Sequence, residues 1–252
     1  MPSEPRILAL ETSGRTGSVA VAQGPALLAT RELSSTMRHA VELMPAIRDL
    51  TRGQGWQPDQ IDHLYLSLGP GSFTGLRIAV AIARAFHQAT GCKLIGVPSL
   101  DIIAQNALSE FTIVIPILDA KRNQVFAARY ERDANGTLTQ TASAALVNPT
   151  EFLNQALERT AELDAISPSK IENRKSKIAL LGEGLTHFQP APSPLIEQLP
   201  PALWPATAAT VHRLGYQLAR QNQFSDPATL LPLYIRLPEA EEVYRKKHNL
   251  PV

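Results

Sequence analysis

The sequence of 252 residues has little cysteine and almost no excess of either charge, and both shortages limit what the protein can be. Its one cysteine, Cys92, excludes a disulfide framework, a cysteine-ligated zinc site and an iron–sulfur cluster, and fits a reducing compartment. The 24 Lys and Arg residues are balanced by 23 Asp and Glu residues. The resulting net charge of +1 excludes a dominantly basic nucleic-acid-binding protein.

The sequence also has no long hydrophobic run. No apolar stretch approaches the ~18 residues that a membrane span needs. The first residues lack the basic-then-apolar pattern of a secretory signal. We therefore expect a cytoplasmic globular protein with no membrane attachment.

Hydrophobic periodicity predicts mixed α/β structure in residues 1–108, which we take as the first subdomain. The expected strands are 7–10, 18–22, 26–33, 61–68 and 93–97, and the expected helices are 37–51, 74–90 and 99–108. Pro45 lies inside the first helix and is expected to kink or divide it, because it lacks a backbone N–H. Ser99 is expected to cap the third helix.

The second half of the sequence begins like the first, with a strand, an acidic residue, a turn and another strand. Glu11 follows the first strand of the chain, and Asp119 follows the strand expected at 112–118. This repetition predicts a duplicated α/β domain. The further expected elements are strands 124–130, 137–146 and 178–181, a hairpin turn at Asn135-Gly136, helices 149–163 and 206–222, and a polar loop at 167–177. We therefore expect a second subdomain at 109–205, and a C-terminal part, 206–252, whose helix packs back on the first subdomain.

A glycine-rich turn, Gly69-Pro70-Gly71-Ser72-Phe73-Thr74-Gly75, connects an expected strand to an expected helix. Glycine permits close approach of a ligand, and a helix start offers N–H groups to an anion. The turn lacks the lysine of a P-loop and the spacing of a dinucleotide fingerprint. The alternative is a tight turn in which Ser72 or Thr74 caps the helix.

Two carboxylates, Glu11 and Asp119, are candidates for a cleft between the two halves, where an acid can hold Mg²⁺ through water near a phosphate. The alternative is that both acids only stabilise their turns. We favour this alternative for Asp119, because residues 120–122 are too bulky to cradle a phosphate. The residues expected to contact an anion or nucleotide weakly are Glu11, Ser13, Gly69, Gly71, Ser72, Thr74 and Gly75.

The histidines give no support for a metal centre. None of the six forms a pair at helical ligand spacing, and Leu43 stands four residues after His39, where a second ligand would lie. Ser72 has no assignable base, and Cys92 is interpreted as a small core residue. We therefore predict no catalytic residues and no bound metal.

The helix expected at 74–90 is apolar on two sides, so it must bury both. One side can meet its own sheet, and the other needs a neighbouring helix or another protein. The residues predicted to form a partner-binding surface, on this helix and on 37–51, are Met37, Ala40, Val41, Met44, Ile47, Leu76, Ala79, Val80, Ala83 and Phe86. The alternative is that the two helices only cover each other within one domain.

The sequence resembles the TsaB family, also called YeaZ. The motifs that carry the resemblance are Leu8-Ala-Leu-Glu-Thr-Ser13, His39 with Leu43-Met-Pro45, Gly69-Pro-Gly-Ser-Phe-Thr-Gly-Leu-Arg77, Gly96-Val-Pro-Ser-Leu100, Asp119-Ala-Lys-Arg122 and Pro232-Leu-Tyr-Ile-Arg236. The resemblance implies an α/β fold, the duplicated actin-like ATPase (ASKHA, RNase H-like) fold with two mixed-sheet subdomains. It also implies a non-catalytic component of the machinery that makes threonylcarbamoyladenosine (t6A) at position 37 of tRNAs reading ANN codons.

The resemblance further implies partners and an absence of cofactors. The implied partners are the catalytic paralogue TsaD, bound through the first two helices, the ATPase TsaE, and a second copy when TsaD is missing. The implied contact with tRNA is indirect. TsaD carries an HxxxH metal motif, of which only His39 is present here, and Glu11 stands where actin-like ATPases have Asp. We therefore expect no cofactor of its own, with weak ADP or ATP-Mg binding at a subunit interface as the exception.

Two other function classes stay open at this stage. The first is an actin-like nucleotide-hydrolysing or phosphotransfer enzyme that would use Glu11 and the two turns around Mg-ATP. The second is a metallopeptidase, which the missing histidine pair disfavours.

Overall fold

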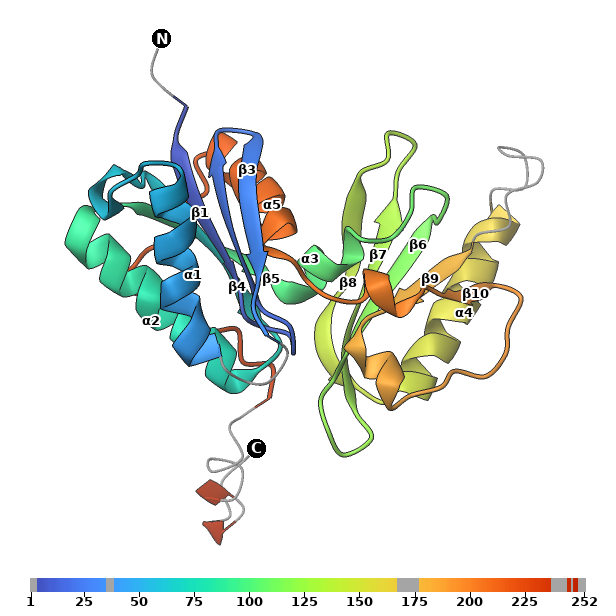
Figure 1. Cartoon of the computed structure of the whole chain (residues 1–252). Coiled ribbons are helices and arrows are strands. Elements are labelled where there is room, and N and C mark those ends of the chain that lie inside the picture. Colours follow the sequence, from blue (N-terminus) through green and yellow to red (C-terminus); the bar gives the residue numbers. More distant parts are fainter. Residues whose placement is uncertain (1–3, 35–38, 167–176, 237–243, 246, 249–252) are drawn as a thin grey trace.

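The computed structural model describes residues 4–34, 39–166, 177–236, 244–245 and 247–248. It contains two five-stranded mixed sheets, one in each half of the chain (Figure 1). The first sheet has the order β3-β2-β1-β4-β5 and is built from β1 (Arg6–Glu11), β2 (Ser18–Gln23), β3 (Ala26–Glu32), β4 (His63–Gly69) and β5 (Lys93–Pro98). The second has the order β10-β9-β6-β7-β8 and is built from β6 (Ile113–Asp119), β7 (Val125–Arg132), β8 (Leu138–Val147), β9 (Ile178–Leu181) and β10 (Ile196–Gln198).

The two sheets have the same topology, which confirms the predicted duplication. In the first, β1 pairs antiparallel with β2 and parallel with β4, so that Leu8 lies between Val21 and Leu64. In the second, β6 pairs antiparallel with β7 and parallel with β9. The chain therefore has the predicted actin-like α/β fold, in which each half opens with a hairpin and returns through a parallel crossover.

Helices cover the sheets and divide the core into layers. They are α1 (His39–Gly53), α2 (Phe73–Thr90), α3 (Ser99–Ala104), α4 (Pro149–Ile166) and α5 (Ala208–Arg220), with short 3₁₀ helices η1 (Pro58–Gln60), η2 (Glu183–Thr186) and η3 (Pro201–Leu203). Figure 1 shows α1 and α2 on the outer side of the first sheet, and α5 and α3 on the side toward the second half. One apolar core lies under α1 and α2, another lies between β6, β7, β9 and α4, and a third joins both halves around α3 and α5. Helix α5 packs on β1, β2, β4 and β5 of the first sheet.

Two local predictions need correction. Helix α1 runs from His39 to Gly53 through Pro45, so the proline does not divide it. Ser99 does not cap α3; its hydroxyl accepts a hydrogen bond from the Gly69 amide at 3.1 Å, and so ties α3 to the end of β4.

Several expectations fall on parts of the chain that the structure does not describe. They are residue Met37, most of the loop expected at 167–177 and most of the tail after residue 236. Within the described part of the chain, no helix is long and apolar enough to cross a membrane.

Candidate functional site

The glycine-rich turn packs directly on the turn that follows β1. The Ser72 amide donates to the Ser13 carbonyl at 2.7 Å, and the Thr12 hydroxyl donates to the Gly75 carbonyl at 2.9 Å. A Cβ on Gly71 would lie 2.3 Å from the Ser13 oxygen, and one on Gly75 would lie 2.0 Å from the Thr12 oxygen. Glycine is needed at both positions because another part of the backbone occupies the space of a side chain.

The same contacts test whether a phosphate fits between the two turns. The carbonyl oxygens of Thr12 and Ser13 occupy the space where side chains on Gly75 and Gly71 would lie, and these oxygens repel an anion. Ser72 acts as the N-cap of α2, since its hydroxyl accepts from the Gly75 amide at 3.3 Å. The tight-turn interpretation is confirmed, with Ser72 rather than the exposed Thr74 as the cap. The residues present do not fit a nucleotide phosphate between these turns.

Glu11 points inward, so the prediction that its carboxylate faces a cleft is wrong. Its side chain is fully buried, and Oε1 accepts from both the amide and the hydroxyl of Ser13 at 2.5 Å each. Burial raises the pKa of Glu11, while the hydrogen bonds from Ser13 lower it by less. Within the described part of the chain, Oε2 has no hydrogen-bond partner. A carboxylate in this position stabilises its own turn and offers a cation one inaccessible oxygen.

Asp119 also stabilises its turn, as predicted. One carboxylate oxygen accepts from the Lys121 amide at 2.8 Å, and the other lies 2.6 Å from the Lys121 ammonium. Partial burial opposes ionisation of Asp119, but the hydrogen bonds from Lys121 outweigh it and lower the pKa. Residues Lys121, Arg122 and Asn123 all have positive φ, between 56° and 64°, which turns the chain sharply between β6 and β7.

A cavity of about 530 Å³ lies beside this second turn, and the sequence did not indicate it. It is bounded by the β6–β7 turn, the first residues of α4 and the segment after η2, including His187, whose Nε2 is 3.9 Å from Asp119. Among the described residues, no group of three or more His, Cys, Asp or Glu side chains is placed to hold a metal ion.

The predicted partner surface on α1 and α2 needs a substantial correction. Five of its members are buried in the core beneath these helices, namely Ile47, Leu76, Ala79, Val80 and Ala83. Ala79, Val80 and Ala83 belong to the apolar core between these helices and the first sheet, and Ile47 belongs to that core and also lines the groove described next. The residues of the prediction that reach the surface are Val41, 71% exposed, and Met44, 48% exposed, with Phe86 half-buried. Ala40 lies in α1, but its side chain, like all of Met37, is outside the described part of the molecule.

The surface of these helices instead contains an apolar groove between α1, η1 and α2, which we call the outer groove. Its volume is about 530 Å³. Its apolar wall is formed by Met44, Pro45, Ile47, Trp56, Ile61 and Phe86, and the basic side chains Arg48 and Arg52 also line it. The helical periodicity indicated Met44, Ile47 and Phe86. Trp56 comes from the connection to β4 and has no periodic signal, and Ile61, expected to begin the strand at 61–68, lies just before β4.

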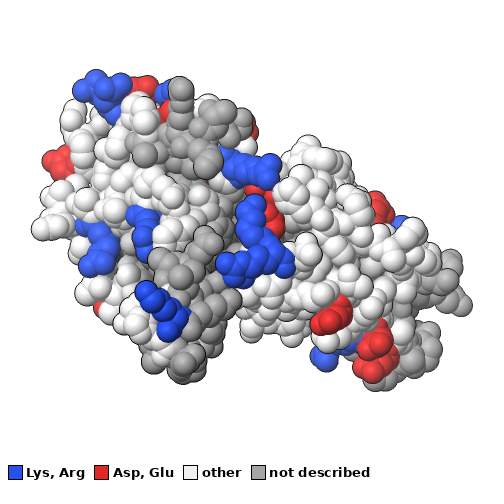
Figure 2. Space-filling model, turned by 90° about the horizontal axis from the view of Figure 1, so that it is seen from below, with Lys and Arg blue, Asp and Glu red and all other residues white. Residues whose placement is uncertain are grey.

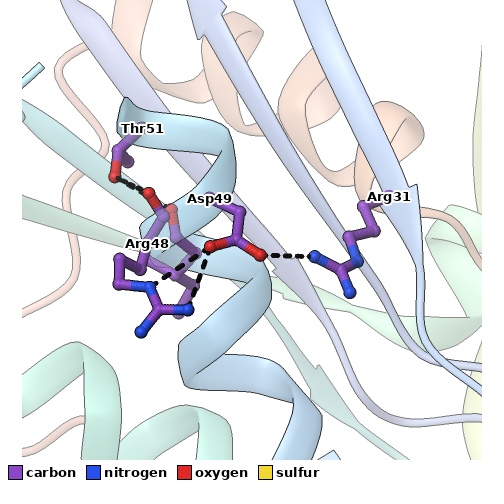
Figure 3. Close-up of polar contacts among 5 residues, drawn as sticks. Arg31, Arg48, Asp49 and Thr51 are labelled. Carbon is purple, nitrogen blue, oxygen red and sulfur yellow. Dashed lines mark hydrogen bonds and ion pairs between the residues drawn. The ribbon is translucent and has the colours of Figure 1, made fainter. Parts of the chain in front are cut away.

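Ion pairs orient α1 beside this groove. Asp49 contacts Arg31 of the edge strand β3 at 2.9 Å and Arg48 of its own helix at 3.1 Å (Figure 3). Hydrogen bonds from Arg31 and then Arg48 lower the pKa of Asp49. Thr51 completes the turn by donating its hydroxyl to the Ile47 carbonyl at 2.9 Å. These contacts attach α1 to β3 and set the position of Arg48 at the groove.

Comparisons with known proteins agree with this fold. The family model described as "TsaD: tRNA N6-adenosine threonylcarbamoyltransferase" matches residues 26–244. The tRNA threonylcarbamoyladenosine biosynthesis protein TsaB of Bacillus subtilis (strain 168) is 26% identical, over 93% of this chain and 96% of its own length. The Escherichia coli (strain K12) protein of the same name is 31% identical, over 61% of this chain and 67% of its own length. The solved structure of YeaZ from Pseudomonas aeruginosa has the same fold, with a TM-score of 0.71 at 22% identity, over 91% of this chain and 99% of that one.

Proposed function

The chain belongs to the TsaB (YeaZ) family, within the group of proteins matched by the TsaD family model, and on this premise we propose that it is an accessory subunit in t6A biosynthesis. In this proposal it acts in the cytoplasm, forms a heterodimer with TsaD, and supports the transfer of threonylcarbamoyl to adenosine 37 of tRNAs reading ANN codons, together with TsaE. Without TsaD, the same surface pairs two copies of the chain.

The observation that carries the proposal is the outer groove with its exposed apolar rim. Met44, 48% exposed, lines the groove together with Trp56 and Phe86, and Val41, 71% exposed, precedes Met44 by three residues on the same helix. Exposed apolar residues beside a groove are typical of a protein-binding surface. The predicted surface is thereby redefined: its contacts are the outward residues of α1 and α2, while the buried residues position them.

The packing of the glycine-rich turn supports a role without catalysis by this chain. In an actin-like nucleotide-hydrolysing enzyme, the two turns must leave room for phosphates and Mg²⁺. Here the turns contact each other through Ser72 and Ser13, and Glu11 is enclosed by its own turn. We therefore include no cofactor of this chain alone in the proposal, and assign any adenine nucleotide to an interface formed with a partner.

The test is complex formation with purified TsaD, measured by size-exclusion chromatography with light scattering. The unmodified chain is expected to give a 1:1 complex, and Met44→Asp and Val41→Asp to weaken it by at least tenfold, because each places a charge in an apolar interface. Leu108→Asp is the matched control: Leu108 is 54% exposed but lies beyond α3, away from the outer groove. Normal binding by both α1 variants would contradict the proposed surface.

The functional readout is reconstitution of tRNA modification with TsaD, TsaE and the threonylcarbamoyl-adenylate synthase. Omitting this chain is expected to abolish t6A formation, and Met44→Asp to reduce it in proportion to the lost complex. Saturable ATP turnover by the isolated chain, lost in Glu11→Ala, would instead support an independent enzyme and overturn the accessory role.

A further inference from the structure

Arg52 is a cation in the wall of the otherwise largely apolar outer groove. It is an exposed residue of α1 and lines the groove together with Met44 and Trp56. Within the described part of the chain, its guanidinium takes part in no ion pair or hydrogen bond with another residue. The other arginine of the groove, Arg48, is held by Asp49 at 3.1 Å. Arg52 therefore remains available to a partner that enters the groove.

The groove supplies no carboxylate of its own for Arg52. Its described lining contains no Asp or Glu. The carboxylates of residues 39–62, all outside this lining, are Glu42, Asp49, Asp59 and Asp62. Asp49 is already engaged by Arg31 and Arg48. Helix α2, on the other side of the groove, contains no acidic residue.

Burial of Arg52 by a partner has a cost that the partner must offset. An apolar surface that covers Met44 and Trp56 also removes water from the guanidinium, and a desolvated charge without a counter-charge is strongly unfavourable. A carboxylate on the incoming surface offsets this cost, because its two oxygens match the planar fork of the guanidinium. The groove thus fits a surface that carries apolar anchors together with an Asp or Glu side chain.

A second copy of this chain does not present that carboxylate from the same groove. In a two-fold contact both copies bring the same surface, so each brings Arg48 and Arg52, and neither brings an acid from the described lining. Figure 2, which views the molecule from below, shows Lys and Arg side chains spread over the half that contains α1 and α2. Like charges and unpaired charges across a contact lower the affinity for the wrong partner.

We propose that Arg52 is a specificity-determining residue of the outer groove, which binds a carboxylate of the partner subunit and disfavours the pairing of two copies of this chain. The inference rests on the proposed function, in which the partner is TsaD, and it states the chemistry that TsaD presents here: an acidic side chain within an apolar patch. Salt then weakens the complex with TsaD, because it screens an attraction, and strengthens the pairing of two copies, because it screens a repulsion.

The test measures the affinity of the full chain for purified TsaD by calorimetry, and its self-association by sedimentation, each in low and in high salt. Arg52→Gln is expected to weaken the TsaD complex roughly tenfold, as for one lost charge pair, and to reduce its salt dependence. The same variant is expected to self-associate more tightly than the unmodified chain. Arg52→Lys keeps the charge without the planar fork, so its affinity for TsaD is expected to lie between the two. Arg159→Gln is the matched control, because Arg159 is exposed on α4 in the second half.

Three outcomes overturn the inference. Equal affinities of Arg52→Gln and the unmodified chain for TsaD would show that no carboxylate meets Arg52. Equal losses in Arg52→Gln and Arg159→Gln would attribute the effect to the overall charge. Weaker self-association of Arg52→Gln would show that Arg52 favours the pairing of two copies. Met44→Asp separates this inference from the proposed function: normal TsaD binding by Met44→Asp rejects the surface itself, whereas its loss there, with normal binding by Arg52→Gln, rejects only the role of Arg52.

Discussion

The carbonyl oxygen of Thr12 lies 2.0 Å from the point where a side chain on Gly75 would begin. This contact joins the first turn of α2 to the end of β1, and the hydrogen bond from the Thr12 hydroxyl to the Gly75 carbonyl reinforces it. A motif of the kind that cradles phosphates thus serves here to bring a helix close to a strand.

Gly75→Ala is therefore expected to destabilise the protein by about 1–3 kcal/mol, because the new methyl group meets backbone that cannot move without shifting β1. The gain in helix propensity, about 1 kcal/mol, opposes this loss but does not exceed it. Urea unfolding measures the difference. Gly53→Ala is the control, since no atom of the described residues lies within 4 Å of a Cβ there, and it is expected to be neutral or slightly stabilising. Equal stability of the two variants would contradict the close contact.

The buried carboxyl of Glu11 predicts a pH dependence of stability. Burial raises the pKa of Glu11 in the folded state above the ordinary value of 4.5. The protonated group therefore contributes its full stabilisation at pH values below the pKa of the unfolded state. This stabilisation is lost as the pH rises through the pKa of the folded state. Glu11→Gln removes this titration, so its stability relative to the unmodified chain is expected to increase from acid to neutral pH. Urea unfolding at several pH values between about 4 and 8 tests the sign. A constant difference across that range would contradict the raised pKa.

A partly buried pair joins the two halves of the molecule. The Tyr130 hydroxyl of β7 donates to the Asp101 carboxylate of α3, and burial raises the pKa of Asp101 although this hydrogen bond lowers it. Tyr130→Phe is expected to cost about 1–3 kcal/mol at neutral pH, because it leaves the carboxylate buried without this donor. At acidic pH, where Asp101 is protonated, Tyr130→Phe is expected to lower the free energy of unfolding by less than at neutral pH. Tyr216→Phe is the control, since Tyr216 bonds the exposed Glu4 at 3.1 Å, and it is expected to change stability little.

The fluorescence of Trp56 can be used to detect binding at the outer groove. It is one of two tryptophans, the other being Trp204, and it lies 7% exposed in the groove wall. In a Trp204→Phe background, addition of TsaD is expected to shift the Trp56 emission, because a partner in the groove changes the environment of the indole. The same background carrying Met44→Asp is expected to show no shift. An unchanged spectrum in a complex that forms normally would place the partner elsewhere.

The duplication and most strands and helices could be predicted from the sequence, because each depends on local patterns, whereas β10 (Ile196–Gln198) was missed and the cap of α2 was left open between Ser72 and Thr74. Alternation of apolar and polar residues in strands, and apolar residues every three or four positions in helices, reflect burial of one face of the element. Turn residues restrict φ and ψ locally. The single cysteine was likewise correctly interpreted as a core residue, since Cys92 is buried. These features depend on neighbours within a few positions of the chain.

Which neighbour each apolar face or buried side chain packs against was decided only by the tertiary structure. Helix α2 is apolar on two sides, and its periodicity could not indicate that Ala79 and Ala83 would meet the sheet. Glu11 could face a cleft or its own turn, and the outcome depends on Ser13 and on the glycine-rich turn that closes over it. Trp56 enters the groove from a connection, and Arg236 reaches Ala120 across more than a hundred residues. Such contacts depend on long-range packing, so local amino-acid patterns determine the elements of this protein while their packing determines its surfaces.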